Sequence, residues 1–268
     1  MGATADALIG ELDRRADVAA VIMFGSRTRE GGNEADQYSD MDLQVITSRP
    51  DELTTPAWII PVIKQGSLRA WAVRDAFGGV KKVSILCDDD AIDLVIVPLK
   101  MMRKARLLLT WGMHRRRPKI RRQFGDIVLT MGGGHRVIKG GNVWENFFAR
   151  VVAEVPEPRI PAVEVENLAA LARVDLHSIE SKLARGELRA AQRWLHVGLM
   201  ETLFKLMHEL KRRRGERSFH DARRAESTLT ALELDQISVS ASLDAAEIAE
   251  AARKAAHTIQ SLRDELRG

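Results

Sequence analysis

The sequence has little cysteine: Cys87 is the single one among 268 residues. One thiol excludes an intramolecular disulfide and favours a reducing compartment, so we expect a cytoplasmic protein. Cysteine and histidine do not cluster at the spacing that zinc sites need. The apolar runs are far shorter than the roughly 20 residues of a membrane-spanning helix, and the first residues lack a signal-peptide pattern. These absences predict a globular protein without a membrane partner and without a zinc site.

Charge is also not strongly biased, since the net charge is +4 and the pI is about 9.4. The basic residues gather in two blocks, 115–122 and 211–214. Such blocks are most often solvated surfaces. Alternatively, one of them contacts a triphosphate, where Arg and Lys stabilise the charge on leaving pyrophosphate. Aromatic residues are not interleaved with these charges, so we do not expect a nucleic-acid partner.

Two short motifs carry most of the chemical information. An apolar strand runs into Gly25 and Ser26, and a second apolar run follows Asp40 and Asp42. Carboxylates at i and i+2 of a strand project to the same face, where they can hold Mg²⁺ together with substrate phosphates. Gly25 lets the backbone approach a phosphate, and Ser26 offers a hydroxyl and an N–H group. This combination indicates phosphoryl or nucleotidyl transfer.

A third carboxylate, Asp93, lies inside the apolar run 91–98. An ionised carboxylate in such a strand is costly unless a cation or hydrogen-bond donors compensate it. A metal shared with Asp40 and Asp42 would do so. The alternatives are an Asx turn at Asp40, which leaves Asp42 unexplained, and an exposed sheet end at Asp93.

These residues resemble a known family. Gly25-Ser26-Arg27, Ser39-Asp40-Met41-Asp42-Leu43 and Ile92-Asp93-Leu94 are similar to the motifs of polymerase-β-like nucleotidyltransferases. Within them, the stretches 25–28 and 92–99 look most like the aminoglycoside 6-adenylyltransferases (streptomycin adenylyltransferases). The resemblance is strong over residues 18–99 and loose over 145–265. It implies a nucleotidyltransferase that uses Mg²⁺ and takes ATP as its substrate.

The resemblance also implies roles for particular residues. Asp40, Asp42 and Asp93 would be catalytic and would ligate the metal, and Asp93 would be either a metal ligand only or also the general base. Arg27 would contact a phosphate or cap the sheet. The acceptor would be a hydroxyl of a small, aminoglycoside-like molecule, as in antibiotic resistance. We expect the nucleotide to contact Gly25, Ser26, Arg27, Ser39 and Lys211.

Other functions fit parts of the sequence. One is a regulatory nucleotidyltransferase of the toxin–antitoxin type, which modifies or binds a partner protein. Such proteins are often the small catalytic domain alone, whereas a helical half follows here. A nucleotide-binding protein without activity would not need three intact acids, and RNA tailing lacks an RNA-binding module. An aminoglycoside would need an acidic site, for which the helical half offers Glu145, Asp175, Glu180 and Glu201.

The hydrophobic pattern predicts an α/β (α+β) nucleotidyltransferase domain with a mixed sheet over residues 1–140. An α-helical bundle that contacts the acceptor and the nucleotide follows over 141–268. We expect a turn at 132–134, solvated turn acids at 88–90, and an oligomeric state that the sequence leaves open. Strands are expected at 19–24, 42–47, 80–87, 91–97, 126–130 and 136–138. Helices are expected at 5–12, 99–111, 165–186, 188–215 and 248–262.

Overall fold

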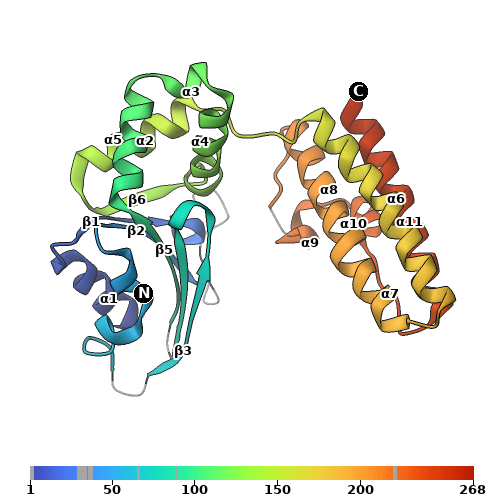
Figure 1. Ribbon diagram of the computed structural model, residues 1–268, viewed down its shortest axis with the longest axis horizontal. Helices are drawn as coiled ribbons and strands as arrows, with labels where there is room; N and C mark the ends of the chain where they lie inside the picture. The colour runs from blue at the N-terminus through green and yellow to red at the C-terminus, as the bar shows by residue number, and fades with distance from the viewer. Residues whose placement is uncertain (1–2, 29–34, 36–38, 65–66, 89, 220–221) are drawn as a thin grey trace. The chain divides into compact units, whose positions relative to one another are not determined.

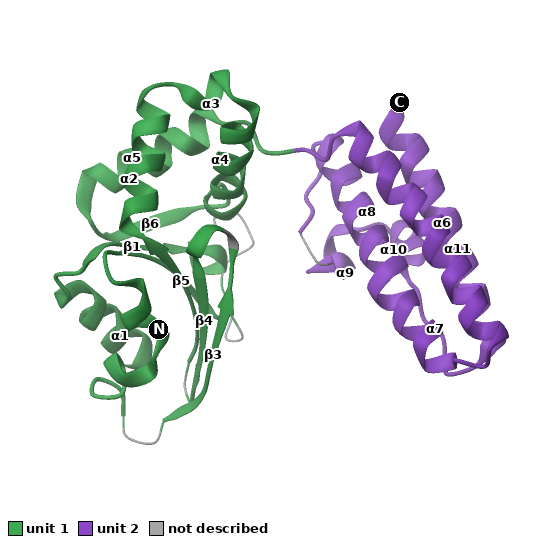
Figure 2. Cartoon of the chain, viewed as in Figure 1, with its two compact units in different colours: residues 1–158 green, residues 159–268 purple. Residues whose placement is uncertain are grey.

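The computed structural model describes residues 3–28, 35, 39–64, 67–88, 90–219 and 222–268. The chain divides into two compact units, residues 1–158 and residues 159–268 (Figure 2). Each unit has its own core. Within the described ranges, no helix combines the length and apolarity that crossing a membrane requires.

Six strands of unit 1 form one sheet in the order β3-β4-β5-β2-β1-β6 (Figure 1). The central pair β2 and β5 is parallel, and all other neighbours are antiparallel. This confirms the predicted mixed sheet, including the hairpin around residues 88–90. The strand bounds are β1 Val18–Phe24, β2 Met41–Thr47, β3 Leu68–Asp75, β4 Lys81–Cys87, β5 Ala91–Pro98 and β6 His135–Lys139.

Side chains alternate between the two faces of this sheet, and each face has its own helical cover. On one face, Leu43, Val45 and Leu94 pack in a core with helix α1 (Ala3–Arg14). On the other face, Ile46 and Val97 pack in a second core. That core is completed by α2 (Leu99–Thr110), α4 (Pro118–Met131) and α5 (Gly141–Glu154). Alternation therefore places Asp42 and Asp93 on the face of Ile46 and Val97.

One predicted strand is wrong. Residues 126–130 are rich in β-branched side chains, but they lie in helix α4, after the short helix α3 (Met113–Arg116). Phe124, Val128 and Met131 recur at helical spacing and are all buried in the second core. Burial of this helical stripe outweighs the β-propensity of the run, which is a weak preference. The triple glycine at 132–134 then forms the predicted turn before β6.

The boundary between the two units falls after residue 158, whereas the sequence placed it after 140. Helix α5 accounts for the difference. Its Phe147, Phe148 and Val151 are buried against the sheet in the second core of unit 1. Its aromatic residues resemble those of a bundle in sequence, so only their packing partners assign them to unit 1.

Unit 2 is a helical bundle built on one apolar core, as predicted. Its long helices are α6 (Ala162–Ala184) and α11 (Ala245–Arg267), with α8 (Glu201–Arg213) and α7 (Leu188–Trp194) beside them. A π-helical segment, Leu195–Met200, joins α7 to α8 where one continuous helix was expected. The connection from α8 to α11 holds two short helices, α9 (Ala225–Thr228) and α10 (Ala231–Ile237), and is longer than expected.

Candidate active site

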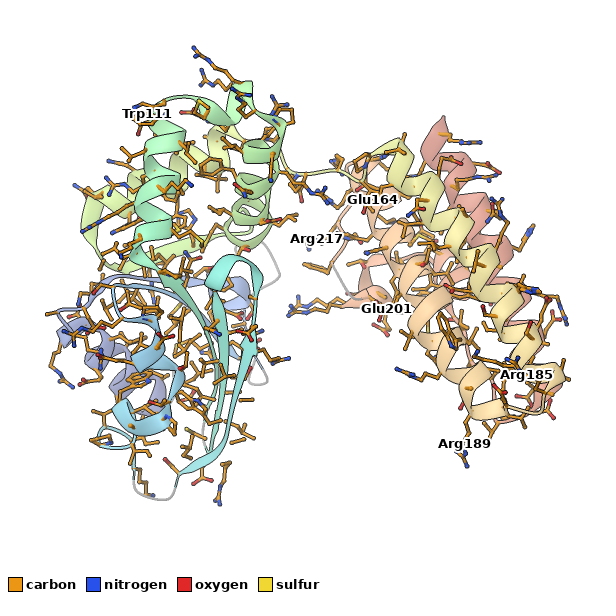
Figure 3. The ribbon with its side chains drawn as sticks, viewed as in Figure 1. Trp111, Glu164, Arg185, Arg189, Glu201 and Arg217 are labelled. Atoms are coloured by element: carbon orange, nitrogen blue, oxygen red, sulfur yellow. The ribbon has the colours of Figure 1, made fainter. Side chains whose placement is uncertain are left out.

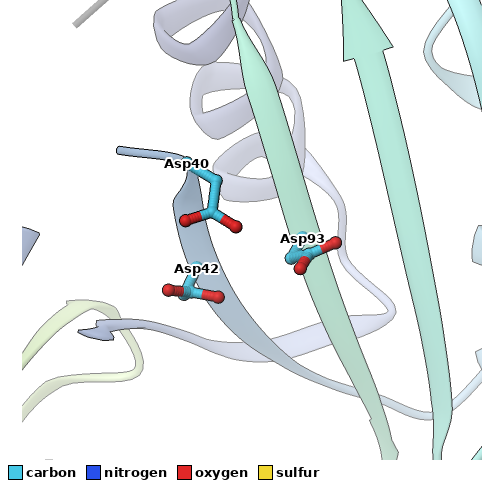
Figure 4. A group of neighbouring side chains, drawn as sticks. All are labelled: Asp40, Asp42 and Asp93. Carbon is cyan, nitrogen blue, oxygen red and sulfur yellow. The ribbon is translucent and has the colours of Figure 1, made fainter. Parts of the chain in front are cut away.

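Three carboxylates meet on one face of the sheet in unit 1 (Figure 4). Asp42 of β2 and Asp93 of β5 are direct partners in the parallel register. Asp40 precedes Asp42 by two positions, so its side chain emerges on the same face. One ligand oxygen from each residue lies within 4.8 Å of the others, and all three residues are half-buried. The structure thus brings together all three acids that the sequence selected.

The Asp93 carboxylate already has two partners from the neighbouring strand β4. The Ser84 hydroxyl donates a hydrogen bond of 2.6 Å to its Oδ1. The Lys82 ammonium lies 2.6 Å from its Oδ2. Ser84 is the register partner of Asp93, and Lys82 lies two residues before it on the same face. These contacts offset the cost of placing an acid in an apolar strand.

Gly25 lies against the Asp42 carboxylate. Its φ of +79° is in the left-handed region, and an added Cβ would approach Asp42 Oδ2 to 2.2 Å. Both the backbone conformation and the available space therefore require glycine here. The sequence assigned Gly25 to phosphate binding, and the structure adds that it makes room for a metal-site carboxylate.

The other predicted nucleotide contacts surround this point. Ser26 is buried, and within the described residues its Oγ has no hydrogen-bond partner. Arg27 donates to the backbone carbonyl oxygens of Ser39 (2.8 Å) and Asp40 (3.3 Å). Of the two roles considered for Arg27, these bonds favour a structural one, because the guanidinium fixes the chain just before Asp42. The unpaired Ser26 hydroxyl remains available to a ligand.

The three carboxylates suit Mg²⁺. They are hard oxygen donors, which is the chemistry that this ion prefers. Across the described residues, Lys82 is the cation that forms an ion pair with the cluster. Three carboxylates gathered this closely repel one another, and a divalent cation would offset that repulsion. Asp40, Asp42 and Asp93 are the residues that would hold the ion.

Lys211 does not have the surroundings that its predicted nucleotide contact needs. It lies on α8 in unit 2 and is 3% exposed. Its Nζ is 3.0 and 3.1 Å from the two carboxylate oxygens of Glu233, and it also pairs with Glu216. Burial would lower the pKa of Lys211, but these two carboxylates outweigh that effect and raise it. The ammonium therefore has its ion-pair partners within the bundle, which argues against a contact with phosphate.

The acids of the β4–β5 turn were expected to be solvated, but one of the described ones is not. Asp88 is exposed and pairs with Arg69, but Asp90 is buried, and its Oδ2 accepts a hydrogen bond of 3.0 Å from the Ala5 backbone N–H. Asp90 thus ties the first turn of α1 to the sheet. Asp89 lies outside the described residues.

The acids considered for a cationic acceptor do not form a group comparable to the cluster. Glu201 of α8 projects from the bundle, as does Arg189 of α7 (Figure 3). Asp175 of α6 packs against Gly198 of the π-helical segment, where an added Cβ would come within 2.7 Å of its Oδ2. Burial raises the pKa of Asp175, which disfavours its charged form. Glu145 lies on α5 of unit 1.

Sequence reasoning missed Lys82 and Ser84. Lys82 and Ser84 alternate in a strand, but their contact with Asp93 depends on the register of β4 with β5. The alternation was visible in the sequence, and the register was not. Beside these residues the sheet has a hollow of 180 Å³, lined by Asp40, Asp93, Ser84 and apolar residues of β3 to β5.

The chain is similar to solved structures of other proteins. No family model and no curated protein matches the chain. An aminoglycoside 6-adenyltransferase from Bacillus subtilis is similar at 12% identity over 98% of this chain and 88% of that chain, with a TM-score of 0.41. A nucleotidyltransferase-like protein from Exiguobacterium sibiricum 255-15 is 14% identical over 97% and 74%, with a TM-score of 0.37. The argument about function rests on the carboxylates.

Proposed function

We propose that this protein is a nucleotidyltransferase that moves AMP from ATP to a hydroxyl group of a small molecule. The observation that carries the proposal is the cluster of Asp40, Asp42 and Asp93 beside Gly25 and the unpaired Ser26 hydroxyl. Three carboxylates within 4.8 Å repel one another, and a fold maintains such a group where a cation binds. The adjoining Gly25-Ser26 turn is suited to phosphate oxygens.

The proposed reaction is an in-line displacement. The oxygen of the acceptor hydroxyl forms a bond to the α-phosphorus of ATP. The bond from that phosphorus to the oxygen bridging to the β-phosphate breaks, and pyrophosphate leaves with the electron pair. The hydroxyl proton passes to a carboxylate, for which Asp93 is the candidate. The products are the adenylylated acceptor and pyrophosphate.

Each residue of the site has its own role in the proposed reaction. Mg²⁺, when bound, neutralises charge on the phosphates and orients them for attack. Asp40 and Asp42 would hold it at the start of β2. Ser26 offers its hydroxyl to the triphosphate, and Gly25 keeps the backbone clear of Asp42. Arg27 fixes residues 39 and 40 and so keeps Asp40 in place.

The test uses α-labelled ATP, Mg²⁺ and a panel of hydroxyl compounds, with products identified by mass. The motif resemblance makes aminoglycosides the first class to include. The Asp42→Asn variant should be inactive. Asp75→Asn is the matched control, because Asp75 is an exposed carboxylate at the end of β3 outside the cluster. Equal turnover by wild type and Asp42→Asn would contradict the proposal.

A further inference from the structure

A large cavity lies on the same sheet face as the three carboxylates. Its volume is 520 Å³, within the range of small-molecule sites. Its floor is formed by Gln44 of β2 together with Val95 and Val97 of β5, and its walls are side chains of α2 and α4. Eleven of the sixteen lining residues are apolar. The whole cavity belongs to unit 1.

Gln44 gives this cavity a polar group that lacks a partner. The residue is 7% exposed and lines the cavity. Within the described parts of the chain, its amide makes no hydrogen bond to another residue. The amide is open to the cavity, so a ligand with a donor or acceptor at this point would find a hydrogen-bond partner there. The cavity thus suits a ligand that is mostly apolar and has a polar group on one edge.

The cavity adjoins the reacting centre. Gln44 follows Asp42 by two positions and Val95 follows Asp93 by two, so these two floor residues are each about 7 Å along their strand from a carboxylate. Gly25 and Ser26, at the end of β1, lie on the opposite side of β2 from β5. In an in-line reaction the attacking oxygen and the leaving pyrophosphate occupy opposite sides of the phosphorus. With pyrophosphate at Ser26, the acceptor approaches from β5, where the cavity lies.

The charges of the lining argue against a polycation. Lys104 and Asp126 are the charged residues that line the cavity, and their formal charges cancel. An aminoglycoside carries several ammonium groups, and it needs a site with an excess of carboxylates. A mostly apolar lining instead favours a body that is itself mostly apolar.

We infer that this cavity binds the acceptor, and that the acceptor is an uncharged alcohol with an apolar ring body and a polar edge for Gln44. The inference rests on the proposed nucleotidyl transfer and names the substrate class of that site. It differs from the aminoglycoside class to which the motifs point.

Binding measurements on the full chain test the inference with two probes. Naphthalen-2-ylmethanol represents the apolar alcohols, and kanamycin represents the polycations. Ala105→Trp fills the cavity from α2, and Leu107→Trp is the matched control, since Leu107 is 52% exposed on the same helix and does not line it. We expect Ala105→Trp to weaken naphthalenylmethanol binding at least about tenfold and Leu107→Trp to leave it unchanged. Gln44→Leu should weaken binding of probes that carry an amide on the ring.

Three results would overturn the inference. The first is equal naphthalenylmethanol binding by wild type and Ala105→Trp. The second is kanamycin binding that Ala105→Trp abolishes, which would assign the cavity to a polycation. The third is displacement of naphthalenylmethanol by adenosine, together with weaker adenosine binding to Ala105→Trp, which would assign the cavity to the nucleobase. Binding of Mg²⁺ and α,β-methylene-ATP to Asp42→Asn tests the proposed function separately, because Asp42 does not line the cavity.

Discussion

The paired acids of the bundle and the carboxylate cluster of unit 1 differ in how they are surrounded. In the bundle, Glu209 is fully buried and pairs with Arg213 at 2.8 Å and Arg212 at 3.5 Å. Glu233 is bound by Lys211 and also closes the capping box of α10 with Thr230. In unit 1, three carboxylates lie together with one ion-paired lysine.

The difference separates structural acids from functional ones. Burial would raise the pKa of Glu233, but hydrogen bonds from Thr230 and Lys211 outweigh it and lower that pKa. Such an acid has all the partners that its charge requires. In unit 1, ligand oxygens of three carboxylates lie within 4.8 Å of one another, and such a group of like charges is the expected condition of a site for a cation.

Asp40→Asn or Asp42→Asn should have the largest effect of all. Each removes a metal ligand, so we expect transferase activity to fall by at least about three orders of magnitude. Stability should be unchanged or slightly higher, because like-charge repulsion is relieved. Turnover and thermal unfolding measured on the same preparation check both parts. Near-native activity of either variant in the presence of Mg²⁺ would show that the cluster in unit 1 is not functional and does not differ in role from the paired acids of the bundle.

Asp93→Asn should lower kcat by several orders of magnitude while affecting ATP affinity much less. The variant loses a metal ligand and the candidate base, but the Ser26 side of the site is intact. Kinetics and ATP titration separate the two quantities. An equal loss in kcat and in ATP affinity would show that Asp93 acts in nucleotide binding rather than in the chemical step.

Lys211→Met should destabilise the bundle by about 3 kcal/mol and leave the chemistry of unit 1 intact. It removes the buried cation closest to Glu233 and leaves that carboxylate with Arg214 at 3.5 Å and the bonds from Thr230. Lys254→Met is the control, because the Lys254 pair with Asp235 is exposed and should contribute less than about 1 kcal/mol. Denaturant unfolding measures both. A raised KM for ATP with unchanged stability would instead restore the nucleotide role of Lys211.

Gly25→Ala should weaken Mg²⁺ binding, since its Cβ would collide with the Asp42 carboxylate. Gly186 is the matched control in the bundle: its φ is +74°, close to that of Gly25, but its surroundings are open. Both variants carry the backbone strain, about 1–2 kcal/mol, and only Gly25→Ala carries the collision. Metal titration by calorimetry should therefore distinguish them. Identical Mg²⁺ affinities of the Gly25 and Gly186 variants would show that a Cβ at residue 25 does not disturb the Asp42 carboxylate.

Lowering the pH should produce the smallest effect. It should reduce the stability of unit 1 at a higher pH than it reduces the stability of the bundle. His114 is buried, and burial holds its pKa below the ordinary value of 6.5. The unfolded chain therefore binds the proton more tightly, so stability falls as the pH drops below about 6.5. Glu233 has a lowered pKa, and its contribution is lost only as the pH falls below its ordinary 4.5. In His114→Phe the loss of stability between pH 7.5 and 5.5 should shrink; an unchanged loss would implicate another group.

Much of this site could be predicted because it depends on local rules. Alternation along a strand places Asp40 and Asp42 on one face, and an acid within an apolar strand marks Asp93. The strand at 126–130 failed because β-propensity is decided by packing, and here a helical stripe is buried instead. The ion pairs that argue against a nucleotide role for Lys211 were missed for a related reason. Its partner Glu233 is distant in sequence, so the ion pair could not be anticipated.

By itself, the sequence determined the three carboxylates, the glycine beside them, the mixed sheet and the helical second half. Those features follow from residue type and short-range periodicity. Only the tertiary structure decided that Asp42 and Asp93 are register partners, that Lys82 compensates Asp93, and that Gln44 faces a cavity without a partner. The reason is physical: register and cavities arise from how separate strands and helices pack, and no local pattern specifies the distances between them.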